Sequence, residues 1–576
     1  MNLKSFFIKP GTPRQRQYEA IRSIVIDKLS VKEAAKKFKY TLSTLYALLR
    51  DTKTGKLDLF PKIEIGPKQR RTPKYMQQEI VVRRKQNMSA KNIHDSLAQE
   101  GYLVSISTVE RVLTDANFSK LKKRSNLQRG NTVKNQEIPD RAAPLDFTVL
   151  EPFHYDCPAV GIFFFLPYII ESGIIDILQQ CNLPQSSAIN STQACLSMLL
   201  LKLIGNERLS HIKAFNHEPG LGVFAGLNVL PKSTYMNTYS CRTSEDMLFS
   251  FQKKVVAHFK NIYPDFYQAD FINLDFHSIP HFGNQSQMEK VWCGARGKAL
   301  KGANTIFAQD AHSNVILYTN ADILRKNEAK EILKFASYWK EINGSIDETL
   351  VFDCKLTTYH VLDELNQEQI KFITLRKRSA DLIKQTLQIP ADHWQKAYLP
   401  IPKRLHKACS VCETQVVFDK CKTNLRQIII KDHGRAEPTF VITNNHDLPL
   451  KDVLIVYAKR WHVENKLAEL VGFFNLNALS SPLMIRIHFD ILWTVIADTL
   501  YHRFAQNLPR FEHERANSLF RQFINIPGRI IYDGENFTIR IRKRAHTPIL
   551  LGVKKLQQKF IVPWLNNKTI AIEWTA

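Results

Sequence analysis

The sequence predicts a multidomain protein that combines helical units with an α/β domain built on a mixed sheet. Its 576 residues are too many for one hydrophobic core, so three or more domains are expected. Helical periodicity fills the first quarter of the chain, whereas strands and helices alternate from Phe271 onward. Hydrophobic residues make up 44% of the chain and charged residues 23%, which is typical of a globular protein rather than a disordered one.

The positive charge of the chain is concentrated near its N-terminus. The formal net charge is +26, and residues 1–134 carry 29 Lys and Arg against 11 Asp and Glu. The remaining residues carry 51 against 43, so about two thirds of the excess lies in the first quarter. Such a distribution is expected of a module that binds a polyanion, although a general gain in solubility would also explain it.

Residues 1–60 have the pattern of a helix-turn-helix unit. A first amphipathic helix precedes a second one that Ser30 caps, and Thr41 or Ser43 begins a short third helix after a tight turn. The turn carries Lys39 where such turns often carry Gly. In units of this kind the last helix enters the major groove of DNA.

Residues 70–124 repeat this plan more clearly. Gly101 ends the middle helix, and Ser105 or Ser107 caps the last one. An ordinary three-helix bundle would show the same pattern, but the duplication and the basic excess favour DNA binding. The residues expected to contact DNA from the two units are Ser43, Thr44, Ser107, Thr108 and Arg111.

The remainder of the chain divides into six predicted segments. These are a linker at 125–145, a helical domain at 146–262, the first part of an α/β core at 265–376, a β-rich insertion at 377–438, the second part of the core with two long helices at 439–510, and a C-terminal region with a β-hairpin at 511–576. The most apolar stretch, Ala159–Ile170, is too short to span a membrane and is predicted to be a buried helix.

Two strands of the α/β core carry an aspartate at or near their ends. Asp275 lies in "NLDFH" and Asp353 in "LVFDCK", and the first and fourth strands of such a sheet could be neighbours. Asp is disfavoured in strands and costly to bury unpaired, and two close carboxylates repel unless a cation lies between them. Oxygen ligands of this kind suit Mg²⁺ or Mn²⁺.

A third acid is expected on the helix "VYAKRWHVENKLAEL". At 100° per residue, Tyr457, Arg460 and Glu464 form a narrow stripe on one helical face, whereas Glu469 points elsewhere. For the helix alone, a surface ion-pair face is the simpler explanation. Combined with Asp275, the stripe instead indicates a site where Glu464 holds metal while the arginine and the tyrosine grip a phosphate backbone.

These residues resemble the DDE transposases of bacterial insertion sequences, in the branch with a Tyr-x2-Arg-x3-Glu signature. The resemblance covers about Asp265 to Gln506. It implies an RNase H-like catalytic core interrupted by a β-rich insertion, with Asp275, Asp353 and Glu464 as catalytic residues that hold Mg²⁺ or Mn²⁺, two ions in all. The branch usually adds a lysine seven positions after the glutamate, but this chain has Val471 there.

Other polar residues are weaker candidates. The loop Cys293–Gly302 offers Arg296, Lys298 and Lys301, which could bind DNA phosphates or could simply be solvated. His406, Cys409, Cys412 and Cys421 are potential zinc ligands, but their spacing matches no common structural site, so unligated thiols are favoured. His277 is expected to be a hydrogen-bonded histidine near the strand end, and Asp310 is a rival acid ranked below the other three.

The sequence thus predicts a DNA transposase that binds the ends of a mobile element and catalyses metal-dependent strand cleavage and strand transfer. Two alternatives stay open: a catalytically idle DNA-binding regulator, and an RNase H-like nuclease without joining activity. The expected partners are double-stranded DNA and further copies of the chain, as a dimer on DNA. The opening residues lack the pattern of a signal peptide and the nine cysteines are irregularly spaced, which predicts a cytoplasmic, nucleoid-associated protein with reduced thiols.

Overall fold

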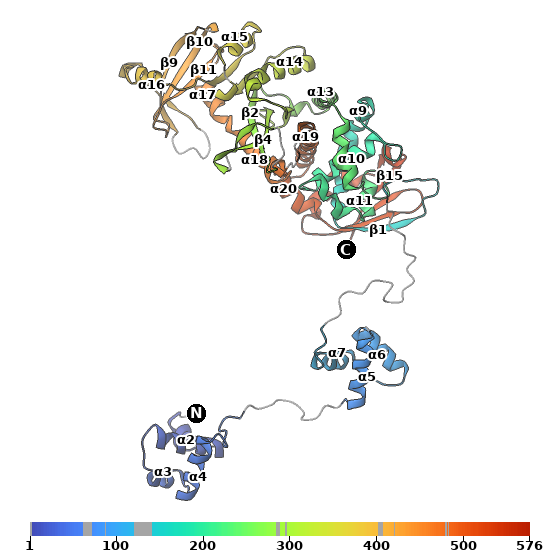
Figure 1. The fold of residues 1–576 in the computed structure, drawn as a ribbon, viewed down its shortest axis with the longest axis vertical. Helices are drawn as coiled ribbons and strands as arrows, with labels where there is room; N and C mark the ends of the chain where they lie inside the picture. Colours follow the sequence, from blue (N-terminus) through green and yellow to red (C-terminus); the bar gives the residue numbers. More distant parts are fainter. Residues whose placement is uncertain are drawn as a thin grey trace. The chain divides into compact units, whose positions relative to one another are not determined.

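The computed structural model describes most of the chain as two compact units, Met1–Lys134 and Asn135–Ala576, shown in Figure 1. The described residues are 3–61, 72–86, 88–119, 141–283, 288–293, 296–356, 358–400, 407–419, 421–478, 481 and 483–576. Most of the predicted linker at 125–145 therefore lies outside the described residues.

The first N-terminal bundle contains the helices α1 (Leu3–Ile8), α2 (Pro13–Val25), α3 (Val31–Phe38) and α4 (Leu42–Lys53). Hydroxyl side chains begin three of them, because a hydroxyl oxygen can accept a backbone N–H that has no partner within the helix. Thr12 caps α2, Ser30 caps α3 in a capping box with Glu33, and Thr41 caps α4. A small core holds the helices together: Ala20, Ala34, Ala35, Phe38 and Leu45.

Lys39 ends α3 in the left-handed region, with φ 55° and ψ 49°. A side chain is strained there, whereas Gly adopts this conformation freely. We expect Lys39→Gly to stabilise the α3–α4 pair by about 1 kcal/mol. Hydrogen exchange of the α3 and α4 amides in the full chain measures this; faster exchange in the variant would contradict it.

The second bundle contains α5 (Lys74–Lys85), α6 (Ala90–Gln99) and α7 (Ile106–Asp115). Gly101 follows α6 with φ +87°, as its predicted role at the helix end requires. The cap of α7 is Ser105, whose hydroxyl accepts the backbone N–H of Thr108 at 3.3 Å. The bundle has its own core: Met76, Ile80, Ile93, Leu97, Val109, Val112 and Leu113.

A large sheet forms the centre of the second unit. Its first strands are β2 (Phe271–Pro280), β3 (Lys290–Cys293), β4 (Lys298–Asp310), β5 (Ile316–Asn320), β6 (Thr349–Phe352) and β7 (Phe372–Leu375), with α14 (Glu331–Asn343) and α15 (Tyr359–Gln367) between the later ones. The spatial order is β5-β4-β2-β6-β7. The pairs β5–β4 and β4–β2 are antiparallel, and β2–β6 and β6–β7 are parallel. β2 and β6, which correspond to the first and fourth strands predicted for this domain, are therefore neighbours in the sheet.

The predicted β-rich insertion extends this sheet. It contains α16 (Ala380–Leu387), β8 (Gln395–Tyr398), β9 (Ala408–Phe418) and β10 (Cys421–Lys431). β11 (Thr439–Thr443) pairs with β7 on one side and β10 on the other, both antiparallel, so β10, β9 and β8 continue the same sheet. Figure 1 shows β9 and β10 at the far end of this unit from the C-terminus.

A second, five-stranded sheet joins distant parts of the chain. β1 (Phe153–Cys157) lies in the segment predicted to be helical, and it pairs with β12 (Gly528–Tyr532). The predicted hairpin is present: β12 and β13 (Phe537–Arg542) are antiparallel, and Gly534 in their turn has φ +103°. The sheet is completed by β14 (Phe560–Val562) and β15 (Lys568–Thr575).

Helices fill the rest of the second unit. Between β1 and β2 lie six helices: α8 (Leu166–Glu171), α9 (Ile174–Gln180), α10 (Ser191–Leu203), α11 (Pro219–Phe224), α12 (Ser233–Tyr239) and α13 (Glu245–Ile262). After β11 lie α17 (Leu450–Lys459), α18 (Trp461–Gly472), α19 (Met484–Gln506), α20 (Ala516–Leu519), α21 (Thr547–Leu551) and α22 (Lys554–Gln557). Among the described residues, no single helix is long and apolar enough to cross a membrane. The helices Val160–Glu171 and Ile174–Gln180 reach that length and apolarity only when they are counted as one segment, and the chain is bent between them.

Candidate active site

Asp275 and Asp353 each come directly after the last registered residue pair of two neighbouring strands. β2 and β6 run parallel with Leu274 opposite Phe352, and each aspartate is the next residue along the chain. Neighbouring strands lie about 4.8 Å apart, and residues at one level of a parallel pair point to the same face. Asp275 is still within β2, whereas Asp353 follows the end of β6 and accepts a hydrogen bond from the backbone N–H of Cys354.

The helix that carries the third acid is broken. The sequence predicts one helix from Leu450 to Phe474, but the structure has α17 and α18 with a junction at Arg460. The backbone N–H of Arg460 bonds to the carbonyl of Tyr457 at 3.2 Å, three residues back, which tightens the turn. The predicted continuous helix is therefore wrong, but the three side chains of the predicted stripe stay in contact, because Arg460 lies over the Tyr457 ring and bonds to Glu464.

Arg460 nevertheless joins two of the acids. Its Nη1 donates to Asp275 Oδ2 at 2.9 Å and its Nη2 donates to Glu464 Oε1 at 3.2 Å. The side chains of Arg460 and Asp275 are only 12% and 15% exposed, whereas that of Glu464 is 59% exposed. A buried acid on the sheet is thus linked by one guanidinium to a solvent-facing acid on α18.

Charge and burial oppose each other at this site. Burial raises the pKa of Asp275, although Arg460 and the Phe276 amide act in the opposite direction. Burial also works against the charged form of Arg460, but the surrounding groups, Asp275 foremost, raise its pKa overall. Burial raises the pKa of Tyr457, so its phenol stays neutral. A further cation beside Asp275 would therefore be favourable.

One donor of Arg460 remains available. Its Nε is buried and has no hydrogen-bond partner among the described residues. The Arg460 guanidinium also lies over the Tyr457 ring, 5.8 Å from the ring centroid. An unpaired buried donor in a cleft of acids is costly for a resting protein, and a phosphate oxygen would satisfy it.

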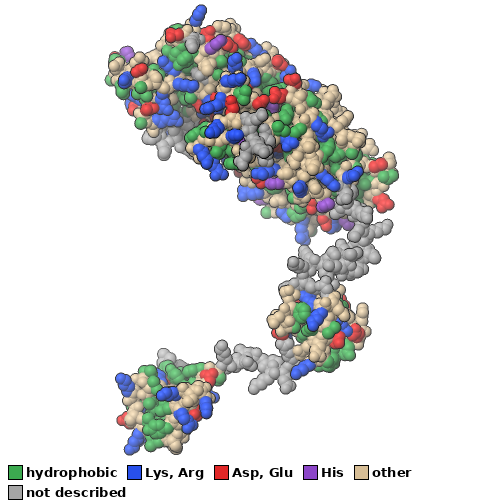
Figure 2. All heavy atoms as spheres, viewed as in Figure 1, with side chains coloured by type: hydrophobic (Ala, Val, Ile, Leu, Met, Phe, Trp, Pro, Cys, Tyr) green, Lys and Arg blue, Asp and Glu red, His purple; other side chains and the backbone are tan. Residues whose placement is uncertain are grey.

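The stretch Cys293–Gly302, predicted to be a loop, is largely in strands: Cys293 ends β3, and Lys298 and Lys301 lie in β4. After Asp275, β2 continues to pair with β4 as far as Pro280 and Gly302, well past the end of β6, and β3 then pairs with β4. Arg296 and Lys298 are exposed and Lys301 is half-buried. The face of this unit drawn in Figure 2 carries a concentration of Lys and Arg side chains near its middle.

The two N-terminal bundles present the same arrangement of hydroxyls. Thr41 Oγ1 lies 3.0 Å from Ser43 Oγ and 2.7 Å from Thr44 Oγ1 at the start of α4. At the start of α7, Ser105 Oγ lies 3.0 Å from the hydroxyl of Ser107 and 2.9 Å from that of Thr108. Hydroxyls at a helix N-terminus suit contacts to phosphate. Arg111, one turn further along α7, is exposed.

Two of the weaker polar candidates have structural partners. Asp310 is 2% exposed, and its carboxylate accepts backbone N–H groups of His312 at 2.9 Å, Ser313 at 2.7 Å and Ala269 at 3.1 Å. The rival acid therefore stabilises a strand end. His277 Nε2 bonds to Asn477 Oδ1 at 2.7 Å, which agrees with the expected hydrogen-bonded histidine.

The cysteines of the insertion do not share a site. Cys409 and Cys412 are three positions apart on β9, so they point to opposite faces and lie in different hydrophobic clusters, while Cys421 lies in a third. His406 lies outside the described residues. None of the nine cysteines, all of them described, forms a disulfide. Val471, where a lysine was expected, packs against the main hydrophobic core.

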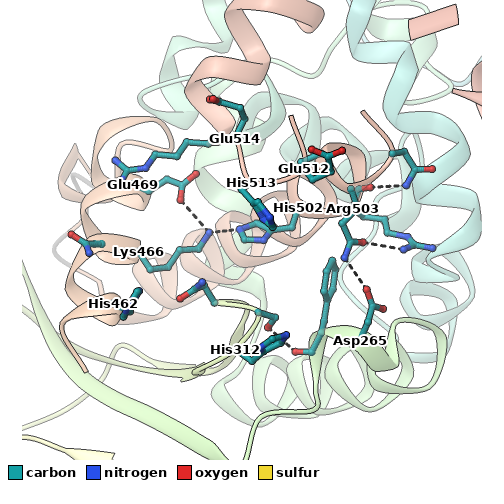
Figure 3. Close-up of a pocket in the computed structure, with 18 residues that line it drawn as sticks. Asp265, His312, His462, Lys466, Glu469, His502, Arg503, Glu512, His513 and Glu514 are labelled. Atoms are coloured by element: carbon teal, nitrogen blue, oxygen red, sulfur yellow. Dashed lines mark hydrogen bonds and ion pairs between the residues drawn. The ribbon is translucent and has the colours of Figure 1, made fainter. Parts of the chain in front are cut away.

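A second polar cluster, between α18 and α19, has no counterpart in the sequence-based predictions. Lys466 Nζ donates to Asp498 Oδ1 at 2.6 Å and lies 2.7 Å from His502 Nε2 and 3.4 Å from Glu469 Oε2. Burial lowers the pKa of His502 to about 3, so its imidazole is neutral. Figure 3 shows the ammonium of Lys466 between Glu469 and His502, which with Lys466 line a cavity of about 880 Å³.

Glu469, Asp498 and His502 also form the only described trio of His, Cys, Asp or Glu residues whose ligand atoms all lie within 4.8 Å of one another. The lysine ammonium already occupies the position among them. No local signal in the sequence marks this cluster, because Lys466 and Asp498 are 32 positions apart.

Comparison with known proteins gives only distant structural matches. No family model matches the chain, and no curated protein matches it. Among solved structures, a piggyBac transposase synaptic complex with hairpin DNA is 10% identical, covers 67% of this chain and 82% of its own, and has a TM-score of 0.34. A pre-cleavage Mos1 transpososome (10% identity, 63% and 77% coverage) and a Mos1 mariner paired end complex with Mn (10% identity, 65% and 89% coverage) each have a TM-score of 0.14.

Proposed function

We propose that this protein is a DNA transposase of the DDE type, which binds the ends of a mobile element and catalyses strand cleavage and strand transfer. The observation that supports the proposal is the placement of three acids from separate elements: Asp275 and Asp353 each directly follow the registered pair Leu274 and Phe352 of two parallel strands, and Glu464 is tied to Asp275 through Arg460. The strand order β5-β4-β2-β6-β7, three antiparallel strands followed by two parallel ones, supports an RNase H-like core.

Asp275, Asp353 and Glu464 would hold Mg²⁺ or Mn²⁺. The donor set fits, because all three residues offer carboxylate oxygens; Arg460, which pairs with Asp275 and Glu464, would give up these contacts to the ions. Bound divalent ions would activate the attacking oxygen and stabilise the leaving oxygen at a phosphodiester. Arg460 would orient the phosphate through its unpaired Nε, with Tyr457 packed beneath the guanidinium.

The basic elements supply DNA affinity in this proposal. Arg296, Lys298 and Lys301 follow the strand that carries Asp275, so they would contact the backbone beside the reacting phosphate. Hydroxyls at the starts of α4 and α7 would contact the element end through the two N-terminal units. Two such units in one chain suit the recognition of extended end sequences.

Arg460→Lys tests the role of the guanidinium. A lysine keeps the charge but cannot bridge two carboxylates and still offer a donor to phosphate. We expect cleavage to fall about 10- to 100-fold with little change in end binding. The matched control is Arg426→Lys, in a comparable pair with Glu413 on β9 and β10, where Arg426 is 8% exposed. Equal losses of cleavage in both variants would contradict a specific role for Arg460.

Joined products separate the proposal from its alternatives. A labelled element end, chosen from inverted repeats that flank the gene, is incubated with the protein, Mg²⁺ and a target plasmid. A transposase produces cut ends and target-joined ends. Cleavage without joining would favour an RNase H-like nuclease, and binding without either would favour a DNA-binding regulator.

A further inference from the structure

The cluster of Lys466, Glu469, Asp498 and His502 fastens α18 to α19. The three side chains that surround the Lys466 ammonium come from both helices, and Glu469 Oε1 also accepts the backbone N–H of Ala516 at the start of α20, at 3.0 Å. Three helices therefore meet at one lysine, which lies two positions after Glu464 and so about 200° away from it around α18.

Lys466 lies in a stripe that is otherwise apolar. Val463, Leu467 and Leu470 are buried at helical spacing on α18, and Lys466 is between them with a side chain that is 3% exposed. An apolar stripe alone can rotate or slide against its neighbour at little cost. A buried ion pair cannot, because displacement would leave charges uncompensated, and such pairs fix register in other helical assemblies.

The rotation of α18 decides where Glu464 points. Glu464 is 59% exposed and bonds to Arg460 at the start of the same helix, so its link to the sheet runs through the pair of Arg460 with Asp275. One residue of rotation turns a helix by 100°, enough to carry a carboxylate away from Asp275. Asp275 and Asp353 need no such support because the sheet fixes them.

We propose that Lys466 is a positioning residue: through Asp498 it fixes the rotation of α18 and so holds Glu464 at the metal site. This inference rests on the proposed function, since it assigns Glu464 to that site. The buried charge of Asp498 depends strictly on Lys466 for its stabilisation. Oδ2 of Asp498 is buried and has no hydrogen-bond partner among the described residues, and no other described cation replaces the Lys466 ammonium there.

The test removes both charges of the pair at once. Lys466→Met with Asp498→Leu removes the two most buried charges of the cluster, and Glu469, at 12% exposed, keeps the backbone N–H of Ala516 as a partner, so we expect the fold to be retained. The matched control is Lys202→Met with Asp490→Leu. That pair is equally buried, at 4% and 8% exposed, and joins α10 to the same helix α19 at 2.7 Å without touching α18. Asp498→Asn is a milder second variant in case the double variant aggregates.

The readout is Mn²⁺ binding by electron paramagnetic resonance on the full chain without DNA, with Asp275→Asn identifying the site. We expect the dissociation constant to rise about tenfold in the Lys466 and Asp498 double variant and to stay unchanged in the control pair. The Mg²⁺ concentration needed for half-maximal cleavage should rise by the same factor, while affinity for end DNA stays within about twofold.

Wild-type Mn²⁺ affinity in the double variant would overturn the inference, as would an equal loss in the control pair. Loss of Mn²⁺ binding in the double variant together with full retention in Asp275→Asn would show instead that the cluster itself holds the ion. If the wild-type protein binds no Mn²⁺ at Asp275, the proposed function fails first, and that result is distinct from the other outcomes.

Discussion

Asp275→Asn is expected to abolish strand cleavage while leaving specific binding to the element end nearly intact. The amide keeps the volume of the side chain but removes the charge that a divalent ion needs. Metal ions contribute several kcal/mol of transition-state stabilisation at such sites, so cleavage should fall about 10³-fold or more. Asp353→Asn and Glu464→Gln should behave alike. Labelled-end cleavage with Mg²⁺, beside a gel shift on the same DNA, measures both quantities.

This prediction has one matched control variant and two possible results that would contradict the assigned roles of the acids. Asp452→Asn changes an exposed acid on α17 and should leave both cleavage and binding unchanged. Full cleavage by Glu464→Gln would show that another acid completes the site. Loss of DNA binding in all three acid variants would indicate a structural role, and the regulator alternative would gain.

Removal of residues 1–134 is expected to have the second largest effect, on DNA affinity. The deleted segment carries 29 of the 80 Lys and Arg residues and only 11 of the 54 Asp and Glu residues. Because phosphate neutralisation releases counterions, fragment 1–134 should bind end DNA with an affinity that falls about 10³-fold between 50 and 200 mM salt. Fragment 146–576 should bind at least about 10²-fold more weakly than the full chain.

Fluorescence anisotropy across a salt series measures these affinities. A charge-matched nonspecific duplex serves as the control for each fragment. If residues 146–576 bind the end as tightly as residues 1–134 do, the assignment of the basic segment to end recognition is wrong.

Local sequence signals predicted those parts of the fold that depend on nearby residues. The caps at Ser30 and Thr41, the turn at Gly534 and the strand that carries Asp275 all have causes within a few positions. The pairing of β2 with β6, which brings the residues just before Asp275 and Asp353 opposite each other, could be expected only as a possibility, because parallel register is set by packing across the whole sheet.

Structural features that depend on contacts between residues far apart in the sequence had no local sequence signal. β1 pairs with β12, which lies near the other end of the chain, so its five residues could not be distinguished from the surrounding helical segment. The junction between α17 and α18 at Arg460 contains no Pro or Gly, so no local signal predicted it. No local signal predicted that Lys466 is buried, because its partner Asp498 lies on α19, 32 positions away.

The most direct test of the central claim maps the metal site on the protein itself. Fe²⁺ replaces Mg²⁺ in the full chain, and ascorbate with peroxide then produces hydroxyl radicals that cut the polypeptide next to the bound ion; mass spectrometry locates the cuts. The proposal predicts cuts beside Asp275 in β2, beside Asp353 after β6 and beside Glu464 in α18, all lost when Asp275 is replaced by Asn. Cuts confined to the surroundings of Glu469, Asp498 and His502, unchanged in the Asp275 variant, would contradict it.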